Sequence, residues 1–191
     1  MERGLLAVPR GVTPFTGVVL AGGRSSRMGR DKAMLVVDGC TLLDRAIAVL
    51  RDAGATTVLV SGDRPLHGGI GDRVPFAGPV GGIASVLPEV ADGATVVVPV
   101  DLPDLDVATL VQLLGALEQA PAACFEGHPL PWAARVDQNL RVAIERVMQE
   151  MPGGPAMRAL HGAIRGIEIP PPAPHVLRNL NTPADFEDFS R

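Results

Sequence analysis

A segment rich in glycine and cationic side chains, "LAGGRSSRMGRDKA" at 20–33, overlaps and follows the apolar run "GVVLA". Glycines such as Gly22 and Gly23 let backbone amides approach an anion without hindrance from a side chain. Arg27 can then grip a phosphate through two parallel hydrogen bonds, while Lys32 acts as a compact point charge. These residue types at this spacing predict a loop that wraps the phosphates of a nucleotide.

A second candidate for chemistry is Asp101, which closes the apolar run "TVVVPV" at 95–100. Parallel strands present their carboxyl ends at one edge of a sheet, where open α/β folds bind ligands. Asp101 is therefore expected beside the phosphate loop, unless it merely starts a turn or a helix. Because Mg²⁺ prefers one or two carboxylates together with phosphate oxygens, Asp101 is the predicted metal ligand, with Mn²⁺ as the alternative ion.

The segments that must position these residues alternate between strand-like and helix-like patterns. Apolar runs predict buried strands at 17–21, 56–60 and 95–101, and a short extended piece at 33–37. Helical spacing of apolar residues predicts helices at 41–54 and 107–119, with Thr41 and Asp106 as N-caps. The alternation predicts an α/β fold, a three-layer α/β/α sandwich with a mostly parallel, Rossmann-like sheet.

The last third of the chain is less regular. It predicts strands on either side of "GHPLP" (127–131), at 122–126 and 132–136, helices at 140–150 and 155–162, and an edge strand at 164–170. A final helix is expected from Thr182, the predicted N-cap, with Asp185 in the capping-box position. Residues 1–15 are interpreted as a loose N-terminal arm, followed by a single domain at 16–191.

Composition excludes several classes of protein. The 191 residues carry a formal net charge of −4, which does not provide the basic field of a nucleic-acid binder. No apolar run approaches the roughly 18 residues of a membrane span, and the N-terminus lacks the apolar stretch of a signal peptide. Cys40 and Cys124 have neither metal nor disulfide spacing and are expected to be reduced thiols. We therefore expect a cytoplasmic protein that binds neither nucleic acid nor membrane.

Two common nucleotide motifs do not fit the glycine-rich segment. A Walker A loop requires GxxxxGK[ST], but Gly29 is followed by "RDKA". The dinucleotide fingerprint GxGxxG also fails, and Ser61 stands where a ribose-binding acid would be needed. From composition alone, an ordinary surface turn rich in Gly, Ser and Arg stays open as an alternative.

Together, the motifs resemble those of the molybdenum cofactor guanylyltransferases, whose signature loop is written LAGGxSxRMGxDK. These proteins share the nucleotide-diphospho-sugar transferase fold. All fixed positions of the signature are present at 20–32. The resemblance continues in family order at "GPVGG" (78–82), "VDLP" (100–103), "GHPLP" (127–131) and "NLNTPADF" (179–186).

The resemblance implies that the chain transfers GMP from GTP to the terminal phosphate of molybdopterin and releases pyrophosphate. It implies nucleotide contacts at Leu20, Ala21, Gly22, Gly23, Lys32, Ser61 and Asp101. The implied catalytic residues are Arg27 and Lys32, which hold the phosphates, and Asp101, which binds the metal. Since the attacking phosphate is already an anion, the reaction requires positioning and charge stabilisation rather than a general base.

The second substrate, molybdopterin, is expected at the two later motifs. His128 of "GHPLP" and Asn179 and Asn181 of "NLNTPADF" are its candidate contacts, and the two asparagines share one face of an extended segment. For Asn181, a role only in starting the last helix is the alternative. A transient contact with a molybdoenzyme or a cofactor-delivery protein is also expected. The remaining histidines are expected at the surface: His67, His161 and His175.

The sequence departs from the family pattern in two places. Ser61 stands where some relatives have an asparagine, and Asp72 lies six residues before Gly78, farther than the aspartate of relatives. Contacts to guanine and ribose at 61–78 are therefore open, as is any help from Asp104 to the metal. One alternative is a cytidylyltransferase or sugar-phosphate nucleotidyltransferase of the same fold; cytidylyl relatives have alanine at position 22. The other is a non-catalytic nucleotide- or cofactor-binding accessory protein.

Overall fold

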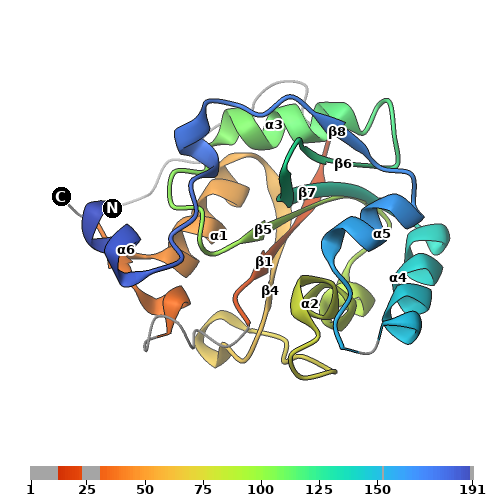
Figure 1. The fold of residues 1–191 in the computed structure, drawn as a ribbon, viewed down its shortest axis with the longest axis horizontal. Helices are drawn as coiled ribbons and strands as arrows, with labels where there is room; N and C mark the ends of the chain where they lie inside the picture. Colours follow the sequence, from red (N-terminus) through yellow and green to blue (C-terminus); the bar gives the residue numbers. More distant parts are fainter. Residues whose placement is uncertain (1–12, 23–30, 152, 190–191) are drawn as a thin grey trace.

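A computed structural model describes residues 13–22, 31–151 and 153–189. At its centre lies a six-stranded sheet with the strand order β4-β1-β5-β7-β6-β8 (Figure 1). These strands are β1 (Phe15–Leu20), β4 (Ala55–Ser61), β5 (Gly93–Pro99), β6 (Ala122–Phe125), β7 (His128–Val136) and β8 (Ile167–Ile169). A separate hairpin is formed by β2 (Val36–Val37) and β3 (Cys40–Thr41).

The sheet is mostly parallel, as the sequence predicts. β1 pairs in parallel with both β4 and β5, and β6 pairs in parallel with β8. β7 is antiparallel to its neighbours β5 and β6. This reversal places the first residue of β7 at the same edge as the carboxyl ends of β1, β4 and β5.

Helices cover both faces of the sheet (Figure 1). They are α1 (Leu42–Asp52), α2 (Gly78–Val86), α3 (Val107–Ala116), α4 (Gln138–Glu150) and α5 (Met157–Ala163). Val19 and Val98 pack with residues of α1 and α3, whereas Val18 and Val97 pack with residues of α2, α4 and α5. This alternation of buried side chains confirms the predicted three-layer α/β/α architecture.

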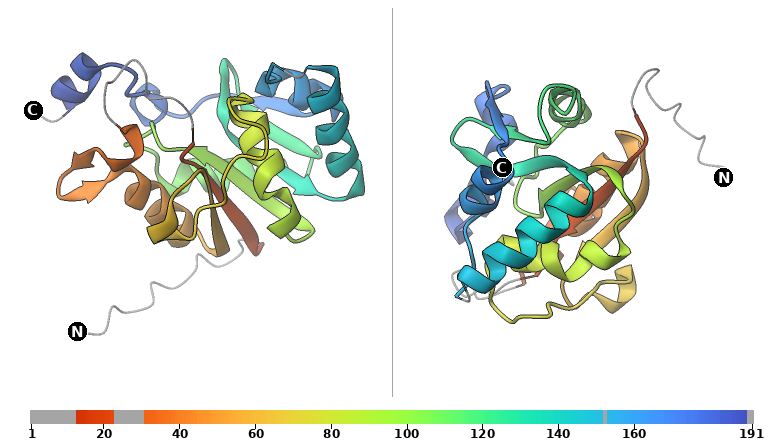
Figure 2. Two further views of the ribbon diagram at one scale, coloured as in Figure 1. Left: turned by 90° about the horizontal axis from the view of Figure 1, so that it is seen from below. Right: turned by 90° about the vertical axis from the view of Figure 1, so that its right-hand side faces the viewer.

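The C-terminal helix α6 (Pro183–Phe189) lies beside the β2–β3 hairpin, at the opposite end of the molecule from α4 (Figure 2). Leu180, which is fully buried, joins Val37 and Leu42 in a small apolar cluster of its own. Phe186 of α6 packs against that cluster. The segment before α6 is therefore held against the start of α1.

The predicted helix caps are confirmed. Thr41 Oγ1 accepts a hydrogen bond from the Asp44 amide at 3.0 Å, and Asp106 caps α3 in the same way. Before α6, the Thr182 amide donates to Asp185 at 2.8 Å and the Asp185 amide donates to Thr182 Oγ1 at 3.1 Å. This reciprocal pair is the capping box that the sequence predicts.

Several element boundaries differ from the sequence prediction: β5 ends at Pro99 rather than 101, α3 ends at Ala116 rather than 119, and β8 spans only Ile167–Ile169. β1 begins at Phe15, one residue inside the range interpreted as an arm, and that side chain is buried in the core. The segment 33–37 is not continuously extended, because a 3₁₀ turn, η1 (Lys32–Met34), precedes β2. Asp31 caps this turn by accepting a hydrogen bond from the Ala33 amide at 3.2 Å.

The prediction that "GHPLP" connects two strands is wrong, because β7 already begins at His128. The register between β6 and β7 shifts between Cys124 and Phe125, which pair with Trp132 and His128, respectively. The two prolines of the motif lie in this shifted stretch and have no partner in β6. A proline, which has no amide hydrogen to donate, is tolerated there.

His161 is buried rather than at the surface. Trp132 Nε1 donates a hydrogen bond to His161 Nδ1 at 3.1 Å, and Cys124 Sγ lies 3.8 Å from Nε2. Gly166 lies so close to the ring that a Cβ there would overlap it. Burial lowers the pKa of His161, although the carboxylate of Glu168 opposes that shift.

Within the described ranges, no helix has the combined length and apolar character needed to cross a membrane. Cys40 and Cys124 are both free thiols, and burial raises the pKa of Cys124 to about 11.

We predict that His161 makes the protein less stable in mild acid. Its folded-state pKa lies below the ordinary value of 6.5, so as the pH falls the unfolded chain takes up this proton first. The contribution is complete above about pH 6.5 and is lost as the pH falls towards the folded-state pKa. His161→Gln should reduce the slope of unfolding free energy against pH, measured by urea titration from about pH 7 to about pH 5. The matched control is His175→Gln at an exposed position; equal slopes in all three proteins would refute the prediction.

Candidate active site

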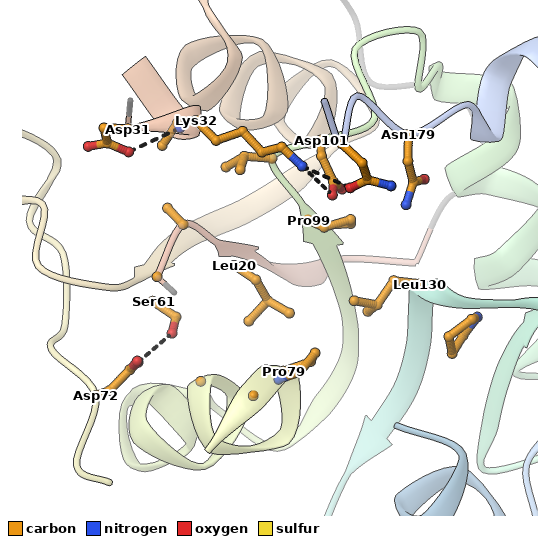
Figure 3. A pocket seen from close by; sticks show the side chains of 18 of the residues that line it. Leu20, Asp31, Lys32, Ser61, Asp72, Pro79, Pro99, Asp101, Leu130 and Asn179 are labelled. Carbon is orange, nitrogen blue, oxygen red and sulfur yellow. Dashed lines mark hydrogen bonds and ion pairs between the residues drawn. The ribbon is translucent and has the colours of Figure 1, made fainter. Parts of the chain in front are cut away.

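A cavity of about 670 Å³ lies at the edge of the sheet where β1, β4 and β5 end (Figure 3). Leu20, Ser61 and Pro99, the last residues of these three strands, line it together. His128, the first residue of the reversed strand β7, lines the same cavity. The volume is within the usual range of small-molecule sites.

The start of the predicted phosphate loop forms one wall of this cavity. Leu20, Ala21 and Gly22 line it, and the Ala21 amide donates to the Ser61 carbonyl at 2.8 Å. Gly62 has φ of 122°, and a Cβ there would lie 2.7 Å from the Gly22 nitrogen. The backbone at 21–22 and the backbone at 61–62 therefore lie too close together for a side chain at position 62. Two other predicted residues of this loop, Gly23 and Arg27, lie outside the described residues.

Lys32, Asp101 and Asn181 meet at the cavity, as Figure 3 shows for the ion pair. Lys32 Nζ lies 3.0 Å from Asp101 Oδ2 and 3.0 Å from Asn181 Oδ1. The side chains of Lys32 and Asp101 are 16% and 19% exposed, so water screens their attraction only in part. The Leu180 amide donates to the Asp101 carbonyl at 2.9 Å and fixes the C-terminal segment beside the pair.

Asn181 does more than start the last helix. Its side chain accepts from Lys32, while its backbone amide donates to Asp185 Oδ2 at 2.8 Å. Thr182, rather than Asn181, is the cap of α6. Asn181 therefore belongs both to the capping box and to the cavity.

The cavity's opposite wall brings together the residues predicted for the second substrate. His128 and Leu130 from β7 line it with Asn179 from the C-terminal segment. Figure 3 shows Leu130 and Asn179 on the side away from Ser61 and Asp72. The site thus has two ends with Lys32 and Asp101 near its upper rim, as drawn.

Asp72 is a site residue whose role the sequence left open. Its Oδ1 accepts a hydrogen bond from Ser61 Oγ at 3.4 Å, and a Cβ built on Gly22 would lie 3.2 Å from its Oδ2. Residues 62–72 fold back and bring Asp72 to the end of β4. Its distance along the chain from Gly78 therefore did not predict this position. The signals in the sequence were an isolated acid in a glycine-rich segment and the aspartate that relatives carry shortly before the motif at 78–82.

Two more lining residues have no signal in the sequence. Arg64 contacts both Ala21 and Asp31. Phe76 is 65% exposed at the cavity and has φ of 64°, which is unusual for a bulky side chain. Asp104 does not line the cavity, and Asp106 caps α3, so neither joins Asp101 there.

The donor set at Asp101 fits a cation that is bound mainly by a substrate's phosphates. In the described parts of the chain, no group of three or more His, Cys, Asp or Glu side chains could hold a metal ion. Asp101 Oδ1 is buried and has no hydrogen-bond partner, whereas Oδ2 faces Lys32. One carboxylate oxygen is therefore left for a hard cation that keeps phosphate and water as its other ligands.

Comparison with known proteins identifies a family model and a relative that match most of this chain. Residues 17–163 match the family model for the MobA-like NTP transferase domain. The molybdenum cofactor guanylyltransferase of Xanthomonas euvesicatoria pv. vesicatoria is 45% identical over 181 residues, covering 93% of this chain and 94% of that protein.

Two solved structures share the fold at low sequence identity. Molybdopterin-guanine dinucleotide biosynthesis protein A from Archaeoglobus fulgidus has a TM-score of 0.71 and 18% identity, covering 92% of this chain and 96% of that chain. The 2-C-methyl-D-erythritol 4-phosphate cytidylyltransferase from Thermus thermophilus has a TM-score of 0.69 and 19% identity, covering 91% and 96%. Because the signature loop, the domain match and the relative at 45% identity agree, we conclude that the chain belongs to the molybdenum cofactor guanylyltransferase family of MobA-like NTP transferases.

Proposed function

We propose that this chain transfers GMP from GTP to the terminal phosphate of molybdopterin, with release of pyrophosphate. The observation that carries the proposal is the meeting of Lys32, Asp101 and Asn181 between the two ends of one cavity. A relative 45% identical over nearly the whole chain is named molybdenum cofactor guanylyltransferase, which supports the same substrates here.

GTP is proposed to occupy the end of the cavity formed by Gly22, Ser61 and Asp72. The carboxylate of Asp72 offers only acceptors, which match the N1–H and amino donors on the edge of guanine. Adenine would instead turn the lone pair of its N1 towards that carboxylate. Gly82 lets α2 pack closely against the end of β4, since a Cβ there would lie 2.8 Å from Ser61 Oγ.

The acceptor, molybdopterin, is proposed to lie at the other end, against His128, Leu130 and Asn179. This arrangement would place its terminal phosphate near Lys32, opposite the α-phosphate of GTP. Holding both reactants in one cavity removes much of the entropic cost of bringing them together. The acceptor phosphate is already anionic, so none of the lining residues has to act as a general base.

Lys32 is proposed to leave Asp101 and Asn181 for the phosphates when GTP enters. Its ammonium then stabilises the negative charge that develops in the transition state. Arg27, which lies outside the described residues, is predicted to neutralise the pyrophosphate leaving group. Before GTP binds, Asn181 is proposed to orient the Lys32 ammonium by accepting a hydrogen bond from it.

Asp101 is proposed to hold Mg²⁺, or Mn²⁺ in its place, together with phosphate oxygens. A divalent ion bound there would supply charge stabilisation to the reacting phosphates. The buried, unpartnered Oδ1 of Asp101 supports this proposal. Departure of Lys32 would free Oδ2 as well.

Cytidylyl transfer is the nearest rival, because the fold alone is shared with a cytidylyltransferase. An alanine at position 22 would press on Asp72, since even an ideal Cβ there lies 3.2 Å from Oδ2. Gly22 instead leaves Asp72 accessible to a base, which favours a purine. A purely accessory binding role is disfavoured because such a protein needs no cation ligand of the kind that Asp101 provides.

We also propose that the reaction takes place in the cytoplasm. The free thiols of Cys40 and Cys124 support a cytoplasmic location. A transient contact with a molybdoenzyme or a delivery protein, which would take up the product, stays a prediction.

We predict that Asp101→Asn removes most metal-dependent turnover, by about 10²-fold or more, because the metal loses its protein carboxylate. Pyrophosphate release should be followed across a Mg²⁺ titration with GTP and molybdopterin. Thermal unfolding would check that the fold is intact, and Asp104→Asn, outside the cavity, is the matched control. An unchanged rate at every Mg²⁺ concentration would show that Asp101 is not the metal ligand.

We predict that Lys32→Ala lowers kcat by roughly 10²–10³, the scale for losing one preorganised charge-stabilising donor, about 3 kcal/mol. The effect should fall on kcat because the charge that Lys32 meets grows in the transition state. Steady-state kinetics with GTP and molybdopterin would separate kcat from KM. A change confined to KM would make Lys32 a ground-state anchor only.

We predict that GTP is preferred over ATP and CTP and that Asp72→Asn weakens this preference about tenfold or more, since a buried hydrogen-bond mismatch costs about 1–3 kcal/mol. The three nucleotides should compete at equal concentration with molybdopterin as acceptor. Asp63→Asn, an exposed neighbour outside the cavity, is the control. Preferential cytidylyl transfer by the unmodified protein would overturn the guanylyl proposal.

A further inference from the structure

Arg64 bridges two residues that lie ten positions apart, at the described ends of the phosphate-loop segment. Its Nε and Nη2 donate to the carbonyl oxygen of Ala21 at 3.2 and 2.8 Å. Its Nη2 also donates to Asp31 Oδ1 at 2.8 Å, and its Nη1 pairs with Asp31 Oδ2. One guanidinium thus ties the end of β1 to the residue directly before Lys32.

Asp31 links the position of Arg64 to the position of Lys32. The same oxygen that accepts from Arg64, Oδ1, accepts from the Ala33 amide and caps η1. The turn is closed by hydrogen bonds from the Met34 amide to the Asp31 carbonyl and from the Leu35 amide to the Lys32 carbonyl, both at 3.1 Å. A shift of Asp31 would therefore move the turn that carries Lys32.

Arg64 lies in a closely packed segment, residues 62–70. The Gly62 amide donates to the Ile70 carbonyl at 2.7 Å, and the Gly69 amide donates to the Arg64 carbonyl at 2.9 Å. A Cβ on Gly69 would lie 2.7 Å from Arg64 Cβ, so the segment closes on itself without spare room. The Arg64 side chain is only 18% exposed. The guanidinium is thus placed before any ligand arrives.

Only arginine has the donor pattern for this position. Its planar fork can meet both oxygens of a carboxylate and still present a donor to a neighbouring carbonyl. A lysine has the charge but not the fixed fork, so it would hold Asp31 or Ala21 less firmly.

We propose that Arg64 is a positioning residue for nucleotidyl transfer, which fixes Ala21 and Asp31 relative to each other and so sets where the ammonium of Lys32 stands against the phosphates. The inference rests on the proposed function in that the ligand is taken to be a nucleoside triphosphate. Because a small displacement of a catalytic group can cost about 10²-fold in rate, the expected loss in Arg64→Ala is of that order and falls mainly on kcat.

A double-mutant cycle tests the proposal. Arg64→Ala, Asp31→Asn and the double variant should be compared by kcat and KM for GTP, with Arg51→Ala on the exposed side of α1 as the matched control. If the two residues act as one unit, the double variant loses no more than the more damaging single variant. Losses that multiply in the double variant would overturn the proposal, as would a loss in Arg64→Ala confined to KM.

Rescue by small molecules gives a readout that a general loss of stability would not produce. Guanidinium ion, at concentrations far below those that unfold proteins, should restore part of the kcat of Arg64→Ala but none of that of Lys32→Ala, with urea as the control additive. Arg64→Lys should keep more kcat than Arg64→Ala and covers the case in which the alanine variant fails to fold. Absence of rescue in a folded Arg64→Ala, with Arg64→Lys at full activity, would overturn the proposal.

The same cycle separates this proposal from the proposed function. Binding of Mg–GTP, Mg–CTP and Mg–ATP in the absence of acceptor should be measured by titration calorimetry for each variant. If the unmodified protein transfers no GMP to molybdopterin, the proposed function fails, and Kd for the tightest nucleotide replaces kcat in the cycle. Non-multiplying losses in Kd would still support Arg64 as a positioning residue, and multiplying losses would still overturn it.

Discussion

The ion pair between Lys32 and Asp101, completed by Asn181, is the interaction on which the site depends. Its members come from the turn before β2, the end of β5 and the C-terminal segment. Because breaking a partly buried pair leaves an uncompensated charge, the three segments constrain one another. The buried Leu180 holds the C-terminal segment in place, so apolar packing supports a polar contact. The same charges are those that a metal–nucleotide complex would take over.

The reversed strand β7 supplies the second half of the cavity. A strand parallel to β5 would begin at the opposite edge of the sheet and would carry His128 and Leu130 away from Lys32. Antiparallel pairing instead brings the start of β7 to the carboxyl ends of β1, β4 and β5. The fold thus uses parallel strands for the proposed nucleotide end and one antiparallel strand for the proposed acceptor end.

Charge is balanced locally at the proposed nucleotide end, although the chain as a whole is acidic. Arg64 pairs with Asp31, and Lys32 pairs with Asp101. Arg64 lies in a closed segment and keeps its partners, whereas Lys32 is proposed to exchange its partners for phosphates. The close contacts around Gly62 and Gly69 account for the fixed position of Arg64.

The sequence by itself determined most of the strands, the helix caps and the location of Asp101 just after a strand, because apolar periodicity and capping depend on neighbouring residues. It also pointed to Lys32 and Asn181 through short motifs. Only the tertiary structure decided that Asp72 and Arg64 reach the cavity and that His161 is buried beside Gly166. It alone decided the direction of β7. These features depend on which distant segments pair and pack, and such contacts leave no periodic pattern in the chain.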